Sequence, residues 1–225
     1  MFEAFKNAVS SQRLEGYRLN GCRDAEVFGR YLLNVALCES FYPSLQHLEV
    51  GLRNALYKAG NVAFRDTMWF TRSFMDNRSI EDIVDAQNKL QRESKDHLDP
   101  NRIVAELKFG FWTRLFGRHY EGYLWRDRAF FATAIPYASR RERQRTNLAT
   151  RFDRIRYFRN RIFHHEPILD YDLARHHDDI IEAMNWIDPA LVKANSIVDR
   201  FSEISGREFY TDLMTKVSDE LNRAS

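Results

Sequence analysis

Hydrophobic residues recur every three to four positions along most of this chain, the spacing that places them on one face of an α-helix. Seven stretches show the pattern, and a looser segment rich in aromatic residues separates the second from the third. We expect helices at about residues 24–40, 43–60, 79–95, 99–116, 146–165, 172–186 and 208–225. The longest of these would bury their apolar stripes against each other, so the pattern predicts an all-α fold built as a helical bundle.

Individual residues set the expected ends of several helices. Asp24 suits an N-cap, and Pro43 is placed to open the second helix, because proline is favoured in the first helical turn. Gly60 is a typical residue at a helix end. Asp99 and Pro100 predict the start of the fourth helix. The sequence therefore indicates a break between the first two helices and another after Gly60.

Length and composition favour one domain. The chain has 225 residues, of which 44% are hydrophobic and 29% are charged, and it contains only nine glycines and five prolines. These residues do not cluster into a linker. We expect a single helical domain over residues 1–225, with its core at about 24–190 and a helical extension at about 191–225.

Several features bear on cellular location. The two cysteines, Cys22 and Cys38, are too few for a disulfide framework in a chain of this size. The first residues are mixed in polarity, unlike a signal peptide. No window approaches the roughly 20 consecutive apolar residues of a membrane span. We expect a cytoplasmic protein that does not enter membranes.

Positive charge is concentrated in one segment, although the net charge is only +2. Residues 137–163 contain nine arginines and two acidic residues, which gives +7 there and −5 in the rest of the chain. Arginine forms planar, two-pronged hydrogen bonds with phosphate, and aromatic side chains such as Tyr157 and Phe158 can stack on exposed bases. The segment predicts an RNA-binding helix, although a basic helix is also compatible with a merely solvated surface.

Arg159, Asn160 and His164 lie near the end of that helix and could supply chemistry. Histidine transfers protons near neutral pH, and arginine can stabilise the negative charge of a phosphorane. Asn160 and His164 lie on one side of a helix, being four residues apart, whereas His164 lies about 140° around the axis from Arg159. One regular helix therefore does not bring the arginine and the histidine together. Either the helix ends near His164, or a second subunit completes the site in a two-fold dimer.

Arg159 projects into the middle of the apolar stripe of its helix. That stripe consists of Leu148, Phe152, Ile155 and Ile162. A buried cation needs a carboxylate partner or an anionic ligand. Glu49 borders the stripe of the 43–60 helix and Arg53 follows it at i+4, so Glu49 could pair with Arg53 or with Arg159. In the plainest interpretation, Arg159 is only an ion-pair residue and His164 is an exposed histidine at the helix end.

Three blocks of the sequence together resemble a known family. They are LEVGLRN at 48–54, FGFW at 109–112 with Leu115 and Phe116, and RNRIFHH at 159–165. The run from Arg159 to His164 is similar to the R-x(4–6)-H signature of HEPN-superfamily ribonucleases. The three blocks in this order resemble the bacterial Abi-like (abortive infection) family within that superfamily, over most of residues 24–190.

The resemblance implies a HEPN-like helical bundle with additional flanking helices, which dimerises so that two R-x(4)-H motifs share one cleft. It implies an endoribonuclease that uses no metal and no cofactor and cuts RNA through its 2′-hydroxyl. Its context would be phage defence or a toxin–antitoxin pair, with an antitoxin protein as a partner. His164 would act as general acid or base, Arg159 would stabilise the phosphorane, and Asn160 would hold the imidazole or a phosphate oxygen.

Other residues would support such a site. His165 also fits the spacing from Arg159 and is the alternative catalytic histidine. Glu49 and Arg53 are possible catalytic or supporting residues, with Glu49 expected to orient Arg159 and not itself to carry a proton. The arginines expected to lead RNA to the site are Arg151, Arg154, Arg156 and Arg161.

Two other functions fit the same sequence. One is an HD-type metal phosphohydrolase, suggested by the dipeptide His177-Asp178, although the gap from His165 to His177 is shorter than that family usually shows. Residues 176–179 fit better as the solvated first turn of a helix, where acidic residues suit the helix dipole. The other is a helical module that binds RNA, a nucleotide or an antitoxin without cutting, with Arg159 as an anion clamp.

Overall fold

The computed structural model describes residues 1–93 and 99–223, and these fold into helices joined by turns and loops, with no β-strand among them. The all-α class is confirmed. The elements are α1 (Phe2–Val9), α2 (Ser11–Glu15), α3 (Asp24–Phe64), η1 (Trp69–Thr71), α4 (Asn77–Glu93), α5 (Pro100–Glu106), α6 (Phe109–Arg114), η2 (Arg118–Tyr120), η3 (Glu121–Trp125), α7 (Arg128–Ala134), α8 (Arg145–Phe163), α9 (Leu173–Ile187), α10 (Pro189–Asn195), α11 (Phe201–Ile204) and α12 (Arg207–Arg223).

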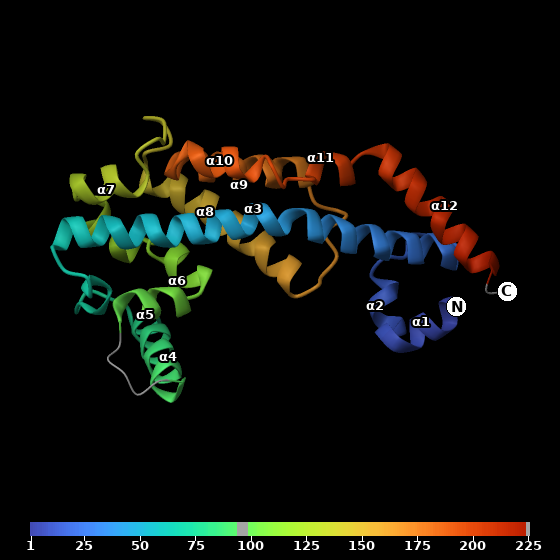
Figure 1. Ribbon diagram of the computed structural model, residues 1–225, viewed down its shortest axis with the longest axis horizontal. Coiled ribbons are helices and arrows are strands. Elements are labelled where there is room, and N and C mark those ends of the chain that lie inside the picture. Colours follow the sequence, from blue (N-terminus) through green and yellow to red (C-terminus); the bar gives the residue numbers. More distant parts are fainter. Residues whose placement is uncertain (94–98, 224–225) are drawn as a thin grey trace.

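One long helix, α3, forms the axis of the molecule (Figure 1). It has 41 residues, and α7, α9, α10, α11 and α12 contact it at different points along its length. Figure 1 shows α4, α5 and α6 projecting near the C-terminal end of α3, whereas α1 and α2 lie near its N-terminal end. Helix α8 contacts α6 and α9. The candidate motif is therefore carried by a helix that is packed on more than one side.

The two helices predicted at 24–40 and 43–60 are a single helix, so Pro43 does not open a helix but lies inside α3. Proline removes one backbone hydrogen bond from a helix and costs roughly 3 kcal/mol there. On either side of it, however, Phe41 and Leu48 are completely buried. Burying one such side chain stabilises the fold by roughly 1.5–3 kcal/mol. Packing along α3 therefore outweighs the local cost of Pro43 and keeps the helix continuous.

Gly60 does not end this helix, which continues to Phe64 and stops where Arg65 adopts a left-handed conformation with a φ of 51°. The glycine has a packing role instead. A Cβ atom at this position would overlap the buried indole ring of Trp69. That indole also donates a hydrogen bond to the carbonyl of Tyr57 at 3.2 Å. Gly60 thus marks the close approach of a side chain to the helix.

The helix predicted at 99–116 is broken into α5 and α6. Asp99 caps its start as expected, because its carboxylate accepts a hydrogen bond from a backbone N–H of the first turn at 2.9 Å. Leu107 and Lys108 have extended backbones, which interrupts the helix. The indole N–H of Trp112 donates a hydrogen bond to the carbonyl of Leu107 at 3.3 Å and so satisfies one backbone acceptor at the break. The spacing of apolar residues correctly predicts helical structure on both sides of the break, but it does not reveal the break itself.

The remaining predicted helices agree with α4, α8, α9 and α12 to within two residues where the structure describes them. The predicted ends of α4 at Lys95 and of α12 at Ser225 lie outside the described residues. The sequence does not predict α1, α2, α7, α10 and α11. These five helices have eight residues or fewer, which is too short to display a helical period clearly.

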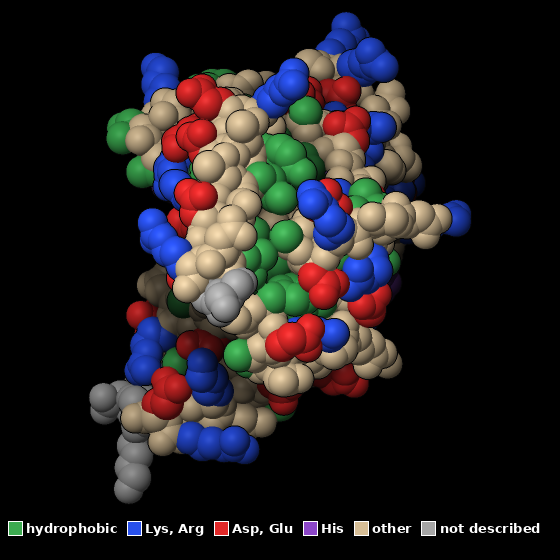
Figure 2. Space-filling view, turned by 90° about the vertical axis from the view of Figure 1, so that its right-hand side faces the viewer, with side chains coloured by type: hydrophobic (Ala, Val, Ile, Leu, Met, Phe, Trp, Pro, Cys, Tyr) green, Lys and Arg blue, Asp and Glu red, His purple; other side chains and the backbone are tan. Residues whose placement is uncertain are grey.

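Two hydrophobic clusters stabilise the fold. The larger surrounds α3, includes the buried faces of α6, α8 and α9, and takes in Phe201 and Ile204 of α11. The smaller lies near the N-terminal end of α3 and consists of Phe2, Leu14, Tyr17, Val27, Phe28 and Val217. Figure 2 shows the molecule from this end, where apolar side chains line a channel and charged side chains of both signs border it. Residues after 191 thus contribute to both clusters.

Helix α3 would be long enough to span a bilayer, since a span needs about 20 residues. Its composition is unsuited to that role, because charged and polar residues such as Arg30, Asn34 and Glu39 recur along it. Among the described residues, no helix combines the length and the apolar character needed to cross a membrane.

Candidate functional site

Helix α8 orients the candidate site by burying its apolar stripe, as predicted. Four side chains of that stripe are inaccessible to solvent: Leu148, Phe152, Ile155 and Ile162. Phe158 extends the buried face, and its ring stacks on the imidazole of His176 with centroids 4.0 Å apart. This packing fixes the rotation of α8 about its axis, so the core sets the directions in which Arg159 and Asn160 project.

Arg159 lies at the edge of the packed face, where α8 meets α3. Its Nη2 donates to Oε2 of Glu49 at 3.2 Å, and its guanidinium carbon lies 3.9 Å from the ring centroid of Phe163. The side chain of Arg159 is 24% exposed and that of Glu49 is 29% exposed, so the ion pair is partly shielded from water. Pairing of Glu49 with Arg159 is therefore confirmed. Arg53 instead donates from Nη1 to the carbonyl of Ala105 at 3.3 Å.

The guanidinium of Arg159 keeps donors that the protein does not satisfy. Its Nε is buried without a hydrogen-bond partner among the described residues, and its contact with Glu49 uses Nη2 alone. Leaving a buried N–H without a partner is unfavourable by about 1–3 kcal/mol. A phosphate oxygen could accept from the Nη donors that Glu49 leaves free, since arginine binds phosphate through charge-assisted hydrogen bonds, whereas the buried Nε is not accessible to a ligand. Glu49 therefore fixes the position of the Arg159 guanidinium, and some of its donors can still bind a ligand.

Helix α8 ends at Phe163, which is one of the two arrangements expected for this motif. The chain turns away through a Schellman motif. In it, the N–H of His165 donates to the carbonyl of Ile162 at 3.0 Å. The N–H of Glu166 donates to the carbonyl of Arg161 at 2.9 Å. His165 occupies the position that glycine usually takes in this motif, with a left-handed φ of 56°.

His164 and His165 are both exposed at this helix end. No hydrogen bond holds either imidazole among the described residues. The carbonyl of Asn160 accepts from the backbone N–H of His164 at 2.9 Å, but its side-chain amide is not hydrogen-bonded to the His164 ring. The structure therefore brings Arg159 and Glu49 together. The side chains of Asn160, His164 and His165 make no hydrogen bond to another side chain among the described residues.

The four arginines expected to lead RNA to the site are all paired with acidic side chains. The partners are Asp179 and Glu182 for Arg151, Asp179 for Arg154, Asp153 for Arg156 and Glu166 for Arg161. Two of these acids lie in the neighbouring helix α9. The positive charge of α8 is thus largely compensated within the fold, and a role of these arginines in RNA binding stays a prediction.

Residues 176–179 form a helical turn of α9, but His176 and Asp179 in it are buried and not solvated as predicted. His176 is 9% exposed and Asp179 is 5% exposed. Both face α8, where His176 stacks on Phe158 and Asp179 accepts a hydrogen bond from Arg154. The sequence places acidic residues correctly near a helix start but gives no sign that arginines of another helix neutralise them.

His177 also has a structural partner. Its Nε2 lies 2.7 Å from Oδ2 of Asp199, and Nδ2 of Asn195 donates to the same oxygen at 3.1 Å. Oδ1 of Asn195 accepts a hydrogen bond from Nδ1 of His47 at 3.1 Å. Within the described ranges, no group of three or more His, Cys, Asp or Glu side chains is arranged to hold a metal ion. His177 therefore belongs to a buried polar network that joins α9, α10 and α3.

Two further arginines, Arg78 and Arg114, lie close to the predicted Arg156, which the sequence does not reveal. Arg78, Arg114 and Arg156 line a polar pocket of about 320 Å³ together with Asp76 and Asp153. Arg114 follows the FGFW block by two residues, which is a weak signal. Nothing in the sequence distinguishes Arg78. The pocket therefore gathers three guanidinium groups and two carboxylates on the side of α8 from which Arg156 projects.

These residues are candidates for a functional site because of their geometry in the structure and not because of similarity to known proteins. No family model, curated protein or solved structure matches the chain. The three sequence blocks nevertheless meet in space. Glu49 of the first block pairs with Arg159 of the third, and α6, which carries the second block, contacts both α3 and α8.

Proposed function

We propose that this protein is a metal-independent endoribonuclease whose active site is centred on Arg159 and His164, with Asn160 in support. One observation carries the proposal: Glu49 and Phe163 hold the guanidinium of Arg159 while some of its donors stay unsatisfied, and the helix that carries Arg159 ends at an exposed histidine. Such a site offers an anion-binding group and a proton-transfer group without requiring a metal ion.

In the proposed reaction, the 2′-hydroxyl of RNA attacks the adjacent phosphorus while the bond from phosphorus to the 5′-oxygen breaks. One histidine takes the proton of the 2′-hydroxyl, and a protonated histidine gives a proton to the leaving oxygen. The products are a 2′,3′-cyclic phosphate and a 5′-hydroxyl. Arg159 stabilises the charge of the phosphorane between these events. DNA lacks the attacking hydroxyl and is not a substrate.

A homodimer would supply the two histidines that this reaction uses. His164 from each subunit, brought together by a two-fold axis near the end of α8, would serve as base and acid. Within one chain, His165 is the alternative partner, because it is adjacent and also exposed. In either arrangement, the helix end at Phe163 frees the imidazole from the direction imposed by a regular helix.

The resemblance of the three blocks to the Abi-like family of HEPN ribonucleases supports the same proposal. It favours a cytoplasmic enzyme of phage defence or of a toxin–antitoxin pair, with an antitoxin protein as a further partner. The polar pocket of Arg78, Arg114 and Arg156 adds a place where RNA phosphates could bind beside α8.

The proposal is tested by incubating the purified chain with RNA in EDTA. We expect products with 2′,3′-cyclic phosphate ends, and we expect His164→Ala to lower the rate at least about 100-fold, as is typical for loss of a general acid or base. His119→Ala is a matched control, because His119 is also exposed but belongs to η2. It should cut RNA at the wild-type rate.

Two outcomes would contradict the nuclease proposal: no cleavage by the wild-type chain under any condition, or equal cleavage by His164→Ala. A contaminating nuclease is recognised by activity that does not change among the wild type, His164→Ala and Arg159→Gln. A DNA strand of the same sequence should stay intact throughout.

A binding module that does not cut is the second candidate. It is favoured by one observation, namely that no side chain of the described residues orients the imidazole of His164 or His165. Catalytic histidines are usually held by a further group. Tight RNA binding without product, lost in Arg159→Gln but kept in His164→Ala, would select this function.

A further inference from the structure

A second cavity opens beside the candidate site, between α2, the first half of α3 and the turn after α8. Its volume is about 470 Å³, which falls within the range of sites that bind small molecules. We call it the tyrosine pocket, because three tyrosines line it. Its lining includes Arg13, Tyr17, Tyr31, Asn34, Tyr42 and His165.

The tyrosines make part of this pocket aromatic. The rings of Tyr17 and Tyr31 meet edge to face, with centroids 5.3 Å apart. Burial raises the pKa of Tyr17 to about 12, so its hydroxyl stays protonated at neutral pH and can donate a hydrogen bond. Tyr42 is partly exposed. Aromatic side chains of this kind stack on nucleobases of any identity.

Arg13 gives the pocket a positive charge that no ion pair in the described part of the chain neutralises, although the carboxylate of Glu39 also lines the pocket. No acidic side chain among the described residues pairs with it, whereas the nearby Arg18 is bound by Glu15 and Asp24 at 2.9 Å each. The charge of Arg13 reaches the Tyr17 hydroxyl, where it opposes the larger effect of burial on the pKa of that group. A free guanidinium beside aromatic rings is a combination suited to a phosphate and a base.

Asn34 contributes a fixed polar group. Its side chain is 3% exposed, and its Oδ1 accepts a hydrogen bond from the backbone N–H of Ile168 at 2.8 Å. Its Nδ2 makes a long contact of 3.7 Å with Sγ of Cys38, and sulfur is a weak acceptor. The amide therefore keeps donor capacity for a ligand, in an orientation that the bond from Ile168 determines.

Two residues connect the tyrosine pocket to the candidate site. His165 lines the pocket and follows His164 directly, and its left-handed backbone is of the kind found at functional sites. Tyr42 provides the other connection. Its ring centroid lies 5.3 Å from that of Phe163, and the Phe163 ring in turn contacts the guanidinium of Arg159. Two aromatic rings therefore separate the pocket from Arg159.

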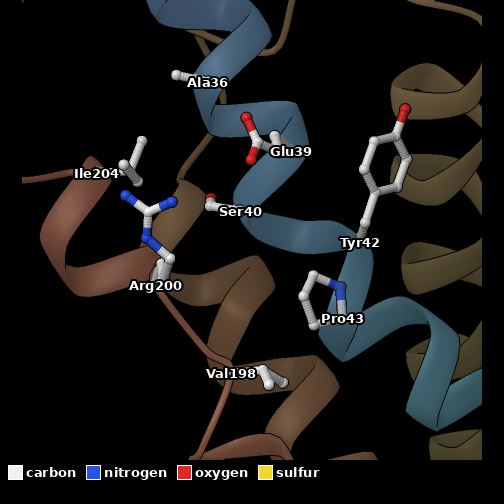
Figure 3. A pocket seen from close by; sticks show the side chains of 8 residues that line it. All are labelled: Ala36, Glu39, Ser40, Tyr42, Pro43, Val198, Arg200 and Ile204. Carbon is white, nitrogen blue, oxygen red and sulfur yellow. The ribbon is translucent and has the colours of Figure 1, made fainter.

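The pocket on the other side of Tyr42 lacks these features. It has a volume of about 200 Å³, and its lining includes Pro43, Arg200 and Glu39, which also lines the tyrosine pocket. In Figure 3, Tyr42 points away from Arg200. Arg200 is already paired with Glu203 at 2.9 Å. Its guanidinium is therefore less available to a ligand than that of Arg13.

We propose that the tyrosine pocket binds one nucleotide, with the base against Tyr31 and Tyr42 and the phosphate at Arg13. The donors of Asn34 and Tyr17 contact the base or the sugar. The identity of this nucleotide rests on the proposed function. In an RNA strand, the nucleotide is the neighbour of the phosphate held by Arg159. Its binding then sets the position of cleavage. A free mononucleotide presents the same chemistry.

Binding is measured by calorimetry with each ribonucleoside 5′-monophosphate and with a 2′-O-methyl tetranucleotide, which has no free hydroxyl to attack phosphorus. Val35→Trp fills the pocket from an exposed position in its lining, and we expect it to weaken binding at least about tenfold. Val62→Trp is the matched control, because Val62 is similarly exposed on the same helix and lies outside the pocket. It should bind like the wild type.

Arg13→Ala tests the phosphate contact separately. This variant should weaken binding of the monophosphates at least about tenfold and leave the weaker binding of the uncharged nucleosides unchanged. Arg128→Ala, which removes another exposed arginine outside the pocket, should leave both unchanged. Equal loss of nucleoside and nucleotide binding in Arg13→Ala would overturn the assignment of Arg13 to the phosphate.

The outcomes separate the two proposals. If mononucleotides bind and Val35→Trp weakens them while no RNA is cut, the pocket is supported and the nuclease proposal fails alone. If His164→Ala abolishes RNA cleavage but neither probe binds, or both bind Val35→Trp like the wild type, the pocket proposal is overturned and the nuclease stands. Tighter binding of the tetranucleotide identifies an RNA strand as the source, whereas tighter binding of a mononucleotide identifies a free nucleotide.

Discussion

At the scale of single residues, the two adjacent histidines at the end of α8 differ in their backbones. His164 has an ordinary φ of −91°, whereas His165 has a left-handed φ of 56° in a position where glycine is usual. For a residue with a Cβ, that conformation costs roughly 1–2 kcal/mol. A histidine there is unfavourable for stability, which is consistent with a role for its imidazole in the tyrosine pocket.

His165→Gly should therefore raise the free energy of unfolding by about 1 kcal/mol, because glycine adopts the left-handed conformation without strain. Urea denaturation of the variant and the wild type measures this. His164→Gly is the matched control. It should lower the free energy of unfolding by about 0.5–1 kcal/mol, since glycine only adds freedom to the unfolded chain at an ordinary φ. A loss of stability in His165→Gly would show that the imidazole makes stabilising contacts.

His176 is a residue whose environment predicts a pH effect on stability. Burial lowers the pKa of His176, and the charge of Arg154 adds to this, while Asp179 and Asp172 oppose it. The unfolded chain therefore binds a proton at a higher pH than the folded chain does. Stability from this residue is complete above about pH 6.5 and is lost as the pH falls through the folded pKa.

His176→Phe should reduce the loss of stability between pH 7.5 and about pH 5, because it removes the titrating group and keeps an aromatic ring against Phe158. Free energies of unfolding at several pH values measure the difference from the wild type. His164→Gln removes an exposed histidine and should keep the pH dependence of the wild type. Parallel curves for the wild type and His176→Phe would contradict the assignment.

At the scale of elements, contacts between helices decide what individual residues do. Asp179 of α9 binds two arginines of α8 and is itself buried. Gly60 looks like a helix end but accommodates the Trp69 ring against α3. Pro43 looks like a helix start but lies within α3. In each case the neighbouring element, and not the local propensity, determines the role of the residue.

Gly60→Ala should lower the free energy of unfolding by about 1–3 kcal/mol, because the added methyl group would overlap a buried indole that cannot move freely. Gly110→Ala is the matched control. Gly110 also lies in a helix, but a Cβ there meets no atom of the described residues within 4 Å. It should raise stability by about 0.5–1 kcal/mol. Equal effects of the two substitutions would contradict the packing role of Gly60.

At the scale of the whole molecule, charge is segregated in the sequence but mixed in space. The segment with a formal charge of +7 is covered in part by acidic residues from α9. Figure 2 shows basic and acidic side chains interspersed at one end of the molecule. Long-range attraction of an anionic ligand is therefore expected to be weaker than the sequence suggests, so the proposed sites at Arg159 and in the tyrosine pocket depend mainly on their own contacts.

The two-subunit form of the proposed nuclease requires a dimer, so light scattering should then give a mass of about twice the 26.8 kDa of one chain. Tyr157 is the most exposed aromatic residue of α8 and shares its outer side with Asn160 and His164 at helical spacing. Tyr157→Arg should shift the dimer to monomer and lower cleavage. Tyr210→Arg on α12 is the matched control and should stay dimeric. A strictly monomeric wild type would contradict the two-subunit site.

The sequence by itself determined the all-α class, the positions of α4, α8, α9 and α12, the buried stripe of α8 and the need of Arg159 for a carboxylate. These follow from local periodicity, because a side chain on the apolar face of a helix must be buried wherever that helix packs. The tertiary structure alone decided that Glu49 pairs with Arg159, that α3 continues through Pro43 and that α9 neutralises the arginines of α8. It also formed the tyrosine pocket from residues far apart in the chain. Such choices depend on which distant segments meet, and no periodicity within one segment encodes that.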